Sequence, residues 1–408
     1  MTERPLGDLL RELAPQVLAA LLRRYGAGQF DICEDAVQEA LIAAVQQWPR
    51  TGRPDDARAW LVTAARRRLI DQIRSESSRR DRERSEAMLH EPLAGVAVAH
   101  ADDSVQLLQL CCHPALTASA QITLTLRAVA GLTTAQIAHA YLLPESTVAQ
   151  RISRAKARIR ETGAAFPAPL GADDRLEAVL AVIYVMFSEG HTVTTGGAIH
   201  DVDLTDQAIH LARMLHAALP EDGEVAGMLA LLLLTDARRP ARTTPGGRLV
   251  PLDEQDRSLW NRDLIAEGIG ILERSLPLGE AGPYALQASI AAVHDEAPDA
   301  ESTDWAQILV LYRLLERQTG NPVVTLNAAV AEAMVFGPRA GLASIDRLAA
   351  SGRPVDAQRA AAVRAHLLER AGSIPEAVAE YRAAARGTRS APERDYLDSR
   401  ARRLGHRQ

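Results

Sequence analysis

The chain has 408 residues, enough for two or three domains, and its hydrophobic content of 47% allows each of them a buried core. Aromatic residues make up only 4% while alanine and leucine dominate, which favours a fold built from helices over one built from sheets. Residues 1–165 carry 21 basic and 19 acidic side chains and the remaining residues carry 25 and 33, so the C-terminal part is the acidic one.

Residues 31–74, the first informative segment, predict two helices. A proline-containing stretch at residues 49–54 follows the first helix, whose apolar face is formed at helical spacing by Ala36, Val37, Ala40, Leu41, Ala44, Val45 and Trp48. The start of this helix carries four carboxylates, Asp31, Glu34, Asp35 and Glu39. The second helix, from about residue 56 to residue 74, begins acidic and ends basic. Such charges suit the helix dipole, so on their own they indicate only ordinary capping.

The segment from residue 75 to about residue 104 separates two modules. It is rich in arginine, glutamate and serine at its start and loses helical periodicity after Leu93. This composition is typical of a flexible linker. We therefore expect a first domain at residues 1–75, a linker at residues 76–104 and a second domain at residues 105–165.

The second domain contains a predicted helix-turn-helix. A short helix over residues 135–141 follows a cap at Thr133 or Thr134, residues 142–144 form the break, and a second helix runs from about residue 145 to 160. The apolar stripe of this second helix consists of Val148, Ile152, Ala155 and Ile159. Its opposite face offers side chains suited to base edges and phosphates, namely Ser146, Thr147, Gln150, Arg151, Arg154 and Arg158. DNA is therefore the first candidate partner.

These segments are similar to those of a known family. Residues 31–41 and 58–74 closely resemble the second conserved domain of extracytoplasmic-function sigma factors, and the helix-turn-helix resembles their fourth domain at the expected distance. About 240 residues follow the helix-turn-helix. Four segments resemble the sigma-factor subgroup with a C-terminal tetratricopeptide-like extension: residues 110–116, 184–190, 233–242 and 247–260.

The resemblance implies an all-α protein in which two small helical sigma domains precede a C-terminal helical-repeat domain. It also implies a dissociable subunit, not an enzyme, that binds core RNA polymerase and directs initiation at promoter DNA. The residues expected to dock on the polymerase are Asp31, Glu34, Asp35 and Glu39. Those expected at the downstream promoter element are Arg66, Arg67, Asp71 and Arg74. The helix from Glu145 is expected to enter the major groove of the upstream element.

The extension, expected over residues 172–408, alternates predicted helices with short breaks. Pro338 and Pro375 each open a helix after a glycine-containing break, and their separation of 37 residues is close to the tetratricopeptide period. In the last unit we expect small residues to pack against large ones at Leu367, Ala371, Ala377 and Tyr381. A generic helical bundle remains an alternative, because the repeats before residue 322 do not align.

The loop at residues 247–260 has two open interpretations, a docking loop or a structural connection. A glycine turn begins this loop, and charged residues follow, together with a tryptophan that we expect to be exposed. The candidate regulatory contacts are Arg248, Asp253, Asp256 and Trp260. Because the net charge of the extension is opposite to that of residues 1–165, we expect the extension to contact and modulate the sigma domains, with the direction of the effect left open.

Other chemistry has little support in the sequence. No phosphate-binding loop or zincin motif occurs, and no metal or cofactor is expected. Cys111 and Cys112 are adjacent, so we interpret them as small core residues instead of metal ligands. The polar stretch around residues 200–203 is interpreted as turn chemistry. The N-terminus has no signal peptide, and the longest apolar runs are about half of the roughly 20 residues that span a bilayer, which predicts a cytoplasmic protein.

Two other functions remain open. A one-component transcription regulator would sense a ligand or protein with its helical extension and bind an operator with the helix-turn-helix. A tetratricopeptide scaffold would leave residues 31–74 unexplained. A sigma factor acts only with core polymerase, whereas a repressor binds duplex DNA unaided. Dependence on the polymerase therefore separates a sigma factor from a one-component regulator.

Overall fold

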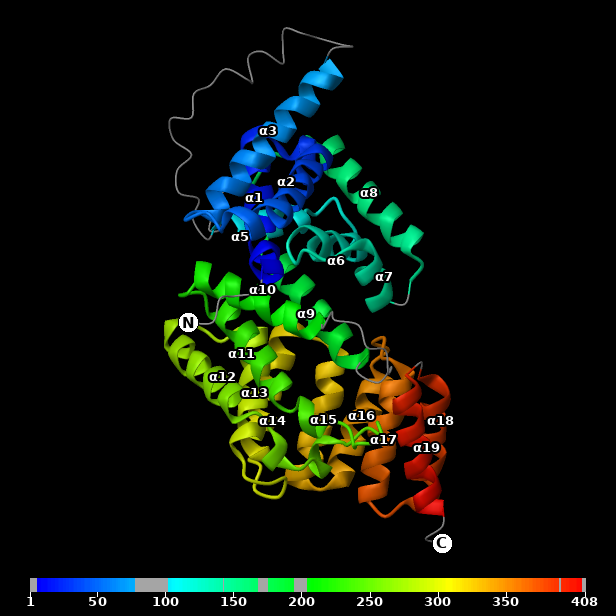
Figure 1. Cartoon of the computed structure of the whole chain (residues 1–408). Helices are drawn as coiled ribbons and strands as arrows, with labels where there is room; N and C mark the ends of the chain where they lie inside the picture. Colours follow the sequence, from blue (N-terminus) through cyan, green and yellow to red (C-terminus); the bar gives the residue numbers. More distant parts are fainter. Residues whose placement is uncertain are drawn as a thin grey trace. The chain divides into compact units, whose positions relative to one another are not determined.

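A computed structural model describes residues 6–77, 102–141, 143–167, 175–193, 204–388 and 390–405. Throughout these ranges the chain consists of helices joined by turns and loops, and the isolated β-bridge found within them joins Thr243 to Leu249 (Figure 1). The expected all-α fold class is confirmed. No helix in the described ranges is long and apolar enough to cross a membrane.

The chain divides into two compact units. Unit 1 comprises residues 1–190 and 200–218, and unit 2 comprises residues 191–199 and 219–408. The expected linker at residues 76–104 lies almost entirely outside the described residues.

Unit 1 begins with α1 (Leu6–Tyr25), α2 (Phe30–Thr51) and α3 (Ala57–Ser77), which pack on one another. Their core includes the fully buried side chains Leu22, Phe30, Leu61 and Leu69. The two helices predicted between residues 31 and 74 are confirmed as α2 and α3. Helix α1, which carries Pro15 in its middle, is not among the predicted elements.

Helix α2 extends past the predicted break and includes Pro49. It ends at Gly52, whose φ of +84° leaves the helical region and whose N–H donates to the Trp48 carbonyl oxygen at 3.0 Å. The Trp48 ring packs edge-on against Trp60 of α3 with centroids 5.4 Å apart. The tryptophan pair therefore fastens the end of α2 to the start of α3.

The described part of unit 1 continues with α5 (Asp102–Cys111), α6 (Ala118–Ala128), α7 (Thr134–Ala140) and α8 (Glu145–Thr162). Helices α7 and α8 confirm the predicted helix-turn-helix, and the whole predicted apolar stripe of α8 is buried. A capping box opens α7: Thr133 Oγ1 accepts from the Gln136 N–H at 3.1 Å, and the Gln136 side chain accepts from the Thr133 N–H at 2.9 Å. Gly163, at φ +63°, ends α8 in the left-handed conformation.

The first helices of the extension also belong to unit 1. These are α9 (Leu176–Val193), as far as residue 190, and α10 (Leu204–Ala218), which packs against α5. Helix α9 buries Val179, Leu180, Val182, Ile183, Met186 and Phe187. The segment that the sequence places at the start of the extension thus shares a compact unit with α1–α3 and α5–α8.

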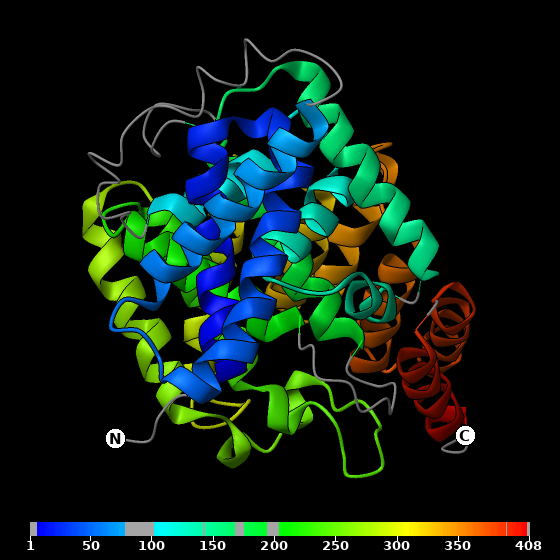
Figure 2. The same ribbon diagram turned by 45° about the horizontal axis from the view of Figure 1, so that its top comes forward.

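Unit 2 is a series of helices in which successive members pack as hairpins (Figure 2). They are α11 (Gly223–Ala237), α12 (Arg262–Ser275), α13 (Pro283–Glu296), α14 (Trp305–Thr319), α15 (Pro322–Phe336), α16 (Pro338–Ala350), α17 (Ala357–Arg370), α18 (Ile374–Gly387) and α19 (Ala391–Gly405). Glycines permit very close approach: a Cβ at Gly227 of α11 would lie 2.5 Å from the Ala285 nitrogen of α13.

The predicted repeat starts lie at helix starts. Pro338 is the first residue of α16, and Pro375 is the second residue of α18. Of the four residues expected to pack there, Leu367, Ala377 and Tyr381 are buried, while the expectation for Ala371 is wrong. Ala371 is exposed because α17 ends one residue before it.

Candidate functional site

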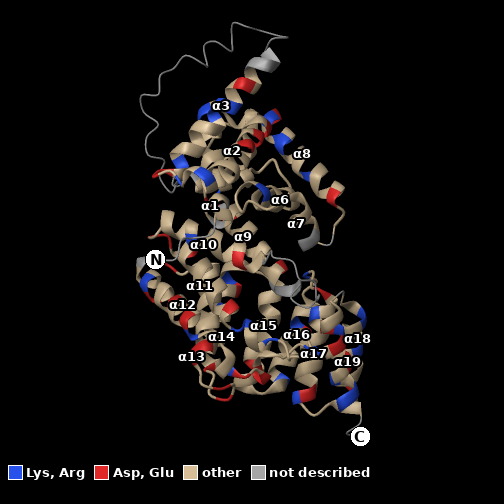
Figure 3. Ribbon diagram, viewed as in Figure 1, with Lys and Arg blue, Asp and Glu red and all other residues tan. Residues whose placement is uncertain are grey.

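The outward face of α8 carries the residues predicted to read DNA. Ser146, Thr147, Gln150, Arg154 and Arg158 are exposed, and Arg151 is half-buried. Basic side chains follow α8 along its length, and others lie on α3 (Figure 3). The hydroxyl, amide and guanidinium groups on this face can contact base edges and phosphates.

Three further basic side chains, Arg127 of α6 and Lys156 and Arg160 of α8, face the acidic start of α2. Arg127 Nε lies 2.6 Å from Glu34 Oε1, and Lys156 Nζ pairs with Glu34 Oε2. Lys156 Nζ lies 3.1 Å from Asp31 Oδ1, and Arg160 Nη1 lies 3.3 Å from Asp31 Oδ2. We call these five residues the ion-pair cluster; it joins α1–α3 to α5–α8 within unit 1.

The centre of the ion-pair cluster is largely buried. The side chains of Glu34 and Lys156 are only 9% and 11% exposed. Lys156 Nζ also lies 5.5 Å from the centroid of the Phe30 ring, a favourable cation–π arrangement. Arg127 donates from Nη1 to the Leu132 carbonyl oxygen at 3.2 Å, so the same guanidinium holds the entry to the helix-turn-helix.

The four carboxylates predicted on α2 therefore fall into two groups. Asp31, although exposed, and the buried Glu34 are ion-paired to α6 or α8, whereas the exposed Asp35 and Glu39 lie outside the ion-pair cluster. Partial burial and the neighbouring carboxylates, Glu34 first among them, raise the pKa of Asp35, while Lys156 lowers it. Glu39 pairs with Arg68 of α3 across 3.4 Å at the surface.

The face of α2 that carries Asp31 and Asp35 also carries two apolar side chains that were not predicted as functional. Ile42 and Val45 are 56% and 53% exposed, so the prediction that Val45 belongs to the buried face is wrong. Counted from Asp31, the positions i+4, i+11 and i+14 (Asp35, Ile42 and Val45) fall on one side of a helix. We call these four residues the α2 stripe. The spacing alone could have identified it, but only the structure shows that nothing in the described residues covers its apolar end.

Some of the DNA contacts predicted on helix α3 lie at its surface. Arg67 and Asp71 are exposed, and Arg66 is half-buried with its Nε enclosed and lacking a hydrogen-bond partner among the described residues. Arg74 lies on α3, but its side chain is outside the described part of the structure.

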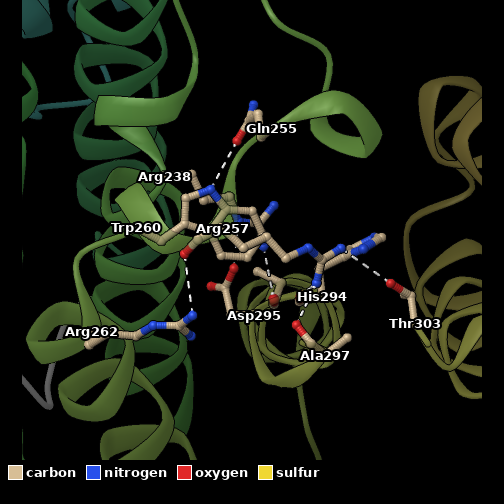
Figure 4. A network of polar contacts seen from close by, with 10 residues as sticks. Arg238, Gln255, Arg257, Trp260, Arg262, His294, Asp295, Ala297 and Thr303 are labelled. Atoms are coloured by element: carbon tan, nitrogen blue, oxygen red, sulfur yellow. Dashed lines mark hydrogen bonds and ion pairs between the residues drawn. The ribbon is translucent and has the colours of Figure 1, made fainter. Parts of the chain in front are cut away.

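The tryptophan of the candidate regulatory loop is buried, which corrects the expectation that it is exposed. Trp260 is 3% exposed, and its indole lies between the guanidinium groups of Arg238 and Arg257, 5.4 Å and 4.8 Å from the ring centroid (Figure 4). The indole N–H donates to the Gln255 side-chain oxygen at 3.2 Å. These three partners of the indole, Arg238, Arg257 and Gln255, all belong to unit 2.

Both arginines are anchored to α13 or to the segment after it. Arg238 Nε donates to Asp295 Oδ1 at 2.7 Å, and Arg257 Nη1 donates to the carbonyl oxygens of His294 and Ala297 at 2.6 and 2.7 Å (Figure 4). Burial, together with these two cations, lowers the pKa of His294 to about 3, so His294 is neutral at physiological pH. We call this arrangement, together with Trp260, the tryptophan network.

The charged residues of the loop other than Arg257 stay at the surface. Arg248, Asp253 and Asp256 are exposed. The Asp256 carboxylate accepts hydrogen bonds from the Ser258 N–H and hydroxyl at 2.9 and 2.7 Å, which lowers its pKa. Arg248 lies at a turn closed by the Gly247 N–H to the Thr244 carbonyl oxygen at 2.8 Å.

The cysteines are enclosed. Cys33, Cys111 and Cys112 are buried, and burial raises the pKa of Cys33 and of Cys112 to about 12, which disfavours the reactive thiolate. Among the described residues no group of three His, Cys, Asp or Glu side chains is placed to hold a metal ion. The polar stretch at residues 200–203 lies outside the described residues.

The tryptophan network predicts a structural role for Trp260. Trp260→Ala should lower the stability of unit 2 by about 3 to 5 kcal/mol, because it opens a cavity and removes the ring on which two arginines stack. The neighbouring Leu259, 51% exposed, supplies a matched control, and Leu259→Ala should change stability by less than about 0.5 kcal/mol. Urea unfolding followed by circular dichroism measures both, and equal stability of the two variants would contradict this role.

Comparisons with known proteins identify the modules. Family models match at residues 9–79 (Sigma-70 region 2), 110–159 (Sigma-70, region 4) and 175–276 (a family of unknown function, DUF6596). The uncharacterized protein R00370 of Rhizobium meliloti (strain 1021) is 41% identical over 360 residues, which cover 85% of this chain and 84% of that protein.

A second relative carries a functional name. The probable ECF RNA polymerase sigma factor SigI of Mycobacterium tuberculosis, from strains CDC 1551 / Oshkosh and H37Rv, is 31% identical over 141 residues, 33% of this chain and 48% of that protein. No solved structure matches the chain.

The family matches show that region 2 coincides with α1–α3 and region 4 with the helices that end in the helix-turn-helix. The chain belongs to the extracytoplasmic-function sigma factors, with a C-terminal helical extension that includes DUF6596.

Proposed function

We propose that this sigma factor binds core RNA polymerase through the α2 stripe, reads two promoter elements with α3 and α8, and is modulated by its extension. The observation that carries the proposal is the division of α8 into a buried apolar stripe and an exposed polar face on a region 4 module. The proposed site of action is the cytoplasm, where polymerase and promoter meet.

The upstream promoter element is assigned to the first three turns of α8. Thr147, Gln150 and Arg154 lie on the exposed face of α8, near the start of the helix. A recognition helix of a helix-turn-helix places its N-terminal residues against base edges in the major groove. Arginine and glutamine are suited to bidentate contacts with guanine and adenine.

The polymerase contact is assigned to the α2 stripe, with Glu34 and Glu39 at its edges. Its carboxylates can meet basic side chains, and Ile42 and Val45 supply apolar area that is exposed in the described structure. Stable protein interfaces combine an apolar centre with a polar rim. The stripe has this composition on a single helix face.

The downstream element is assigned to α3. Arg67 and Asp71 are one helical turn apart and exposed, and Arg66 precedes them. Arginines on such a face suit phosphate contacts, which position a protein on DNA without reading its sequence.

The extension is assigned a modulating role, whose support is that α10 packs against α5, the helix that leads into the region 4 match. Within the loop at residues 247–260, the exposed Arg248 and Asp253 remain the candidates for a contact with another surface. Trp260 no longer qualifies, because its ring is used inside unit 2.

Arg154→Ala should weaken promoter-dependent transcription, since each lost base or phosphate contact costs about 1 to 3 kcal/mol of binding. Run-off transcription with purified core polymerase measures the loss. Arg339→Ala removes an exposed arginine from α16 in unit 2 and serves as the charge-matched control with unchanged output. Operator-like binding of duplex DNA without polymerase, with no stimulated transcription, would favour the one-component regulator.

Reversing the charge of Asp35 and Glu39 together, as Asp35→Arg with Glu39→Arg, should weaken binding to core polymerase at least several-fold. Both residues are exposed, so the buried face of α2 is left intact. Gln47→Arg adds positive charge to an exposed site of α2 away from the α2 stripe and should bind normally. Equal affinities of the reversed and control proteins, measured by co-purification with core enzyme, would contradict the assignment.

A further inference from the structure

We propose that Lys156 keeps this sigma factor in a closed state, by ion-pairing the start of α2 to the recognition helix and so withholding part of the polymerase-binding face. The inference rests on the proposed function of α2. It adds an autoinhibitory contact that lies entirely within unit 1.

The contact is specific to one side of α8. The promoter-reading residues Gln150 and Arg154 point to solvent, while Lys156 and Arg160, in the last two turns, reach α2. A single helix thus presents one set of side chains to DNA and another to the polymerase-binding module.

Both carboxylates at the start of α2 are fully engaged in the closed state. Glu34 has one oxygen on Arg127 and the other on Lys156, and Asp31 has one oxygen on Lys156 and the other on Arg160. A basic side chain of the polymerase cannot approach the buried Glu34 until Lys156 leaves. Polymerase binding through Glu34 and the closed state therefore exclude each other.

The ion-pair cluster suits a switch better than a permanent joint. Removing two charges from water offsets most of the attraction between them, so a buried pair contributes little net stability. It nevertheless specifies one arrangement strongly, because breaking it leaves a buried charge unpaired. A polymerase that supplies its own cations and releases Glu34 to water can therefore compete with Lys156.

Lys156 is the only lysine in the sequence, all other basic side chains being arginine or histidine. Its ammonium is a compact point charge and the one side-chain primary amine that reductive methylation can modify. Methylation of the Lys156 peptide, followed by mass spectrometry, thus reports on the closed state without reference to polymerase or DNA.

The first experiment measures the methylation rate in the full-length protein. Lys156 should react slowly in the wild type and several-fold faster in Glu34→Gln, where its central partner has lost its charge. Glu39→Gln is the matched control, because Glu39 lies on the same helix but pairs with Arg68 instead of Lys156. Equal rates in all three proteins would overturn the closed state.

The second experiment measures affinity for core polymerase without DNA. Lys156→Gln should bind about fivefold more tightly than the wild type, since a larger fraction of the protein is competent to bind. Lys156→Arg, which keeps the charge, should resemble the wild type. Arg158→Gln removes the same charge two residues away, where the guanidinium pairs with Glu161 at the surface, and should also resemble the wild type.

The outcomes are separable. Wild-type affinity in a folded Lys156→Gln protein, with thermal melting as the test of folding, would overturn the autoinhibitory role. Failure of every variant to bind polymerase would instead refute the proposed function of α2, and the methylation rates would then decide the closed state alone.

Discussion

The carboxylate of Glu34, buried between Arg127 and Lys156, is the interaction on which the arrangement of unit 1 depends. Three helices from two sigma regions meet at this one side chain. Its two oxygens pair with α6 and α8, while residues in the first turns of α8 remain exposed. The face proposed to read the promoter and the face proposed to bind polymerase are therefore linked through the ion-pair cluster.

Local rules account well for the helices. Helical spacing predicts the buried face of α8, and glycine or proline at the breaks predicts where helices start and stop. The capping box at Thr133 and the starts of α16 and α18 follow from chemistry that is local in sequence. Recognition of the family rested on residues 31–41 and 58–74, which lie inside the region 2 match.

What local rules could not provide is the identity of distant partners. The burial of Glu34 depends on Lys156, 122 residues downstream, and no periodicity in α2 reveals that pairing. Trp260 was predicted to be exposed because it follows charged residues, yet Arg257 among them is buried and stacks on its ring. Val45 shows the reverse case, an apolar residue at helical spacing that finds no covering element in the described structure.

The most direct test of the account is to follow Lys156 while core polymerase is added. With saturating core enzyme, the methylation rate of Lys156 should rise several-fold above that of the free protein, because polymerase takes the α2 face and releases α8. A Lys156 that stays as slow to react in the polymerase complex as in the free protein would show that the ion-pair cluster survives binding, and would contradict the central claim.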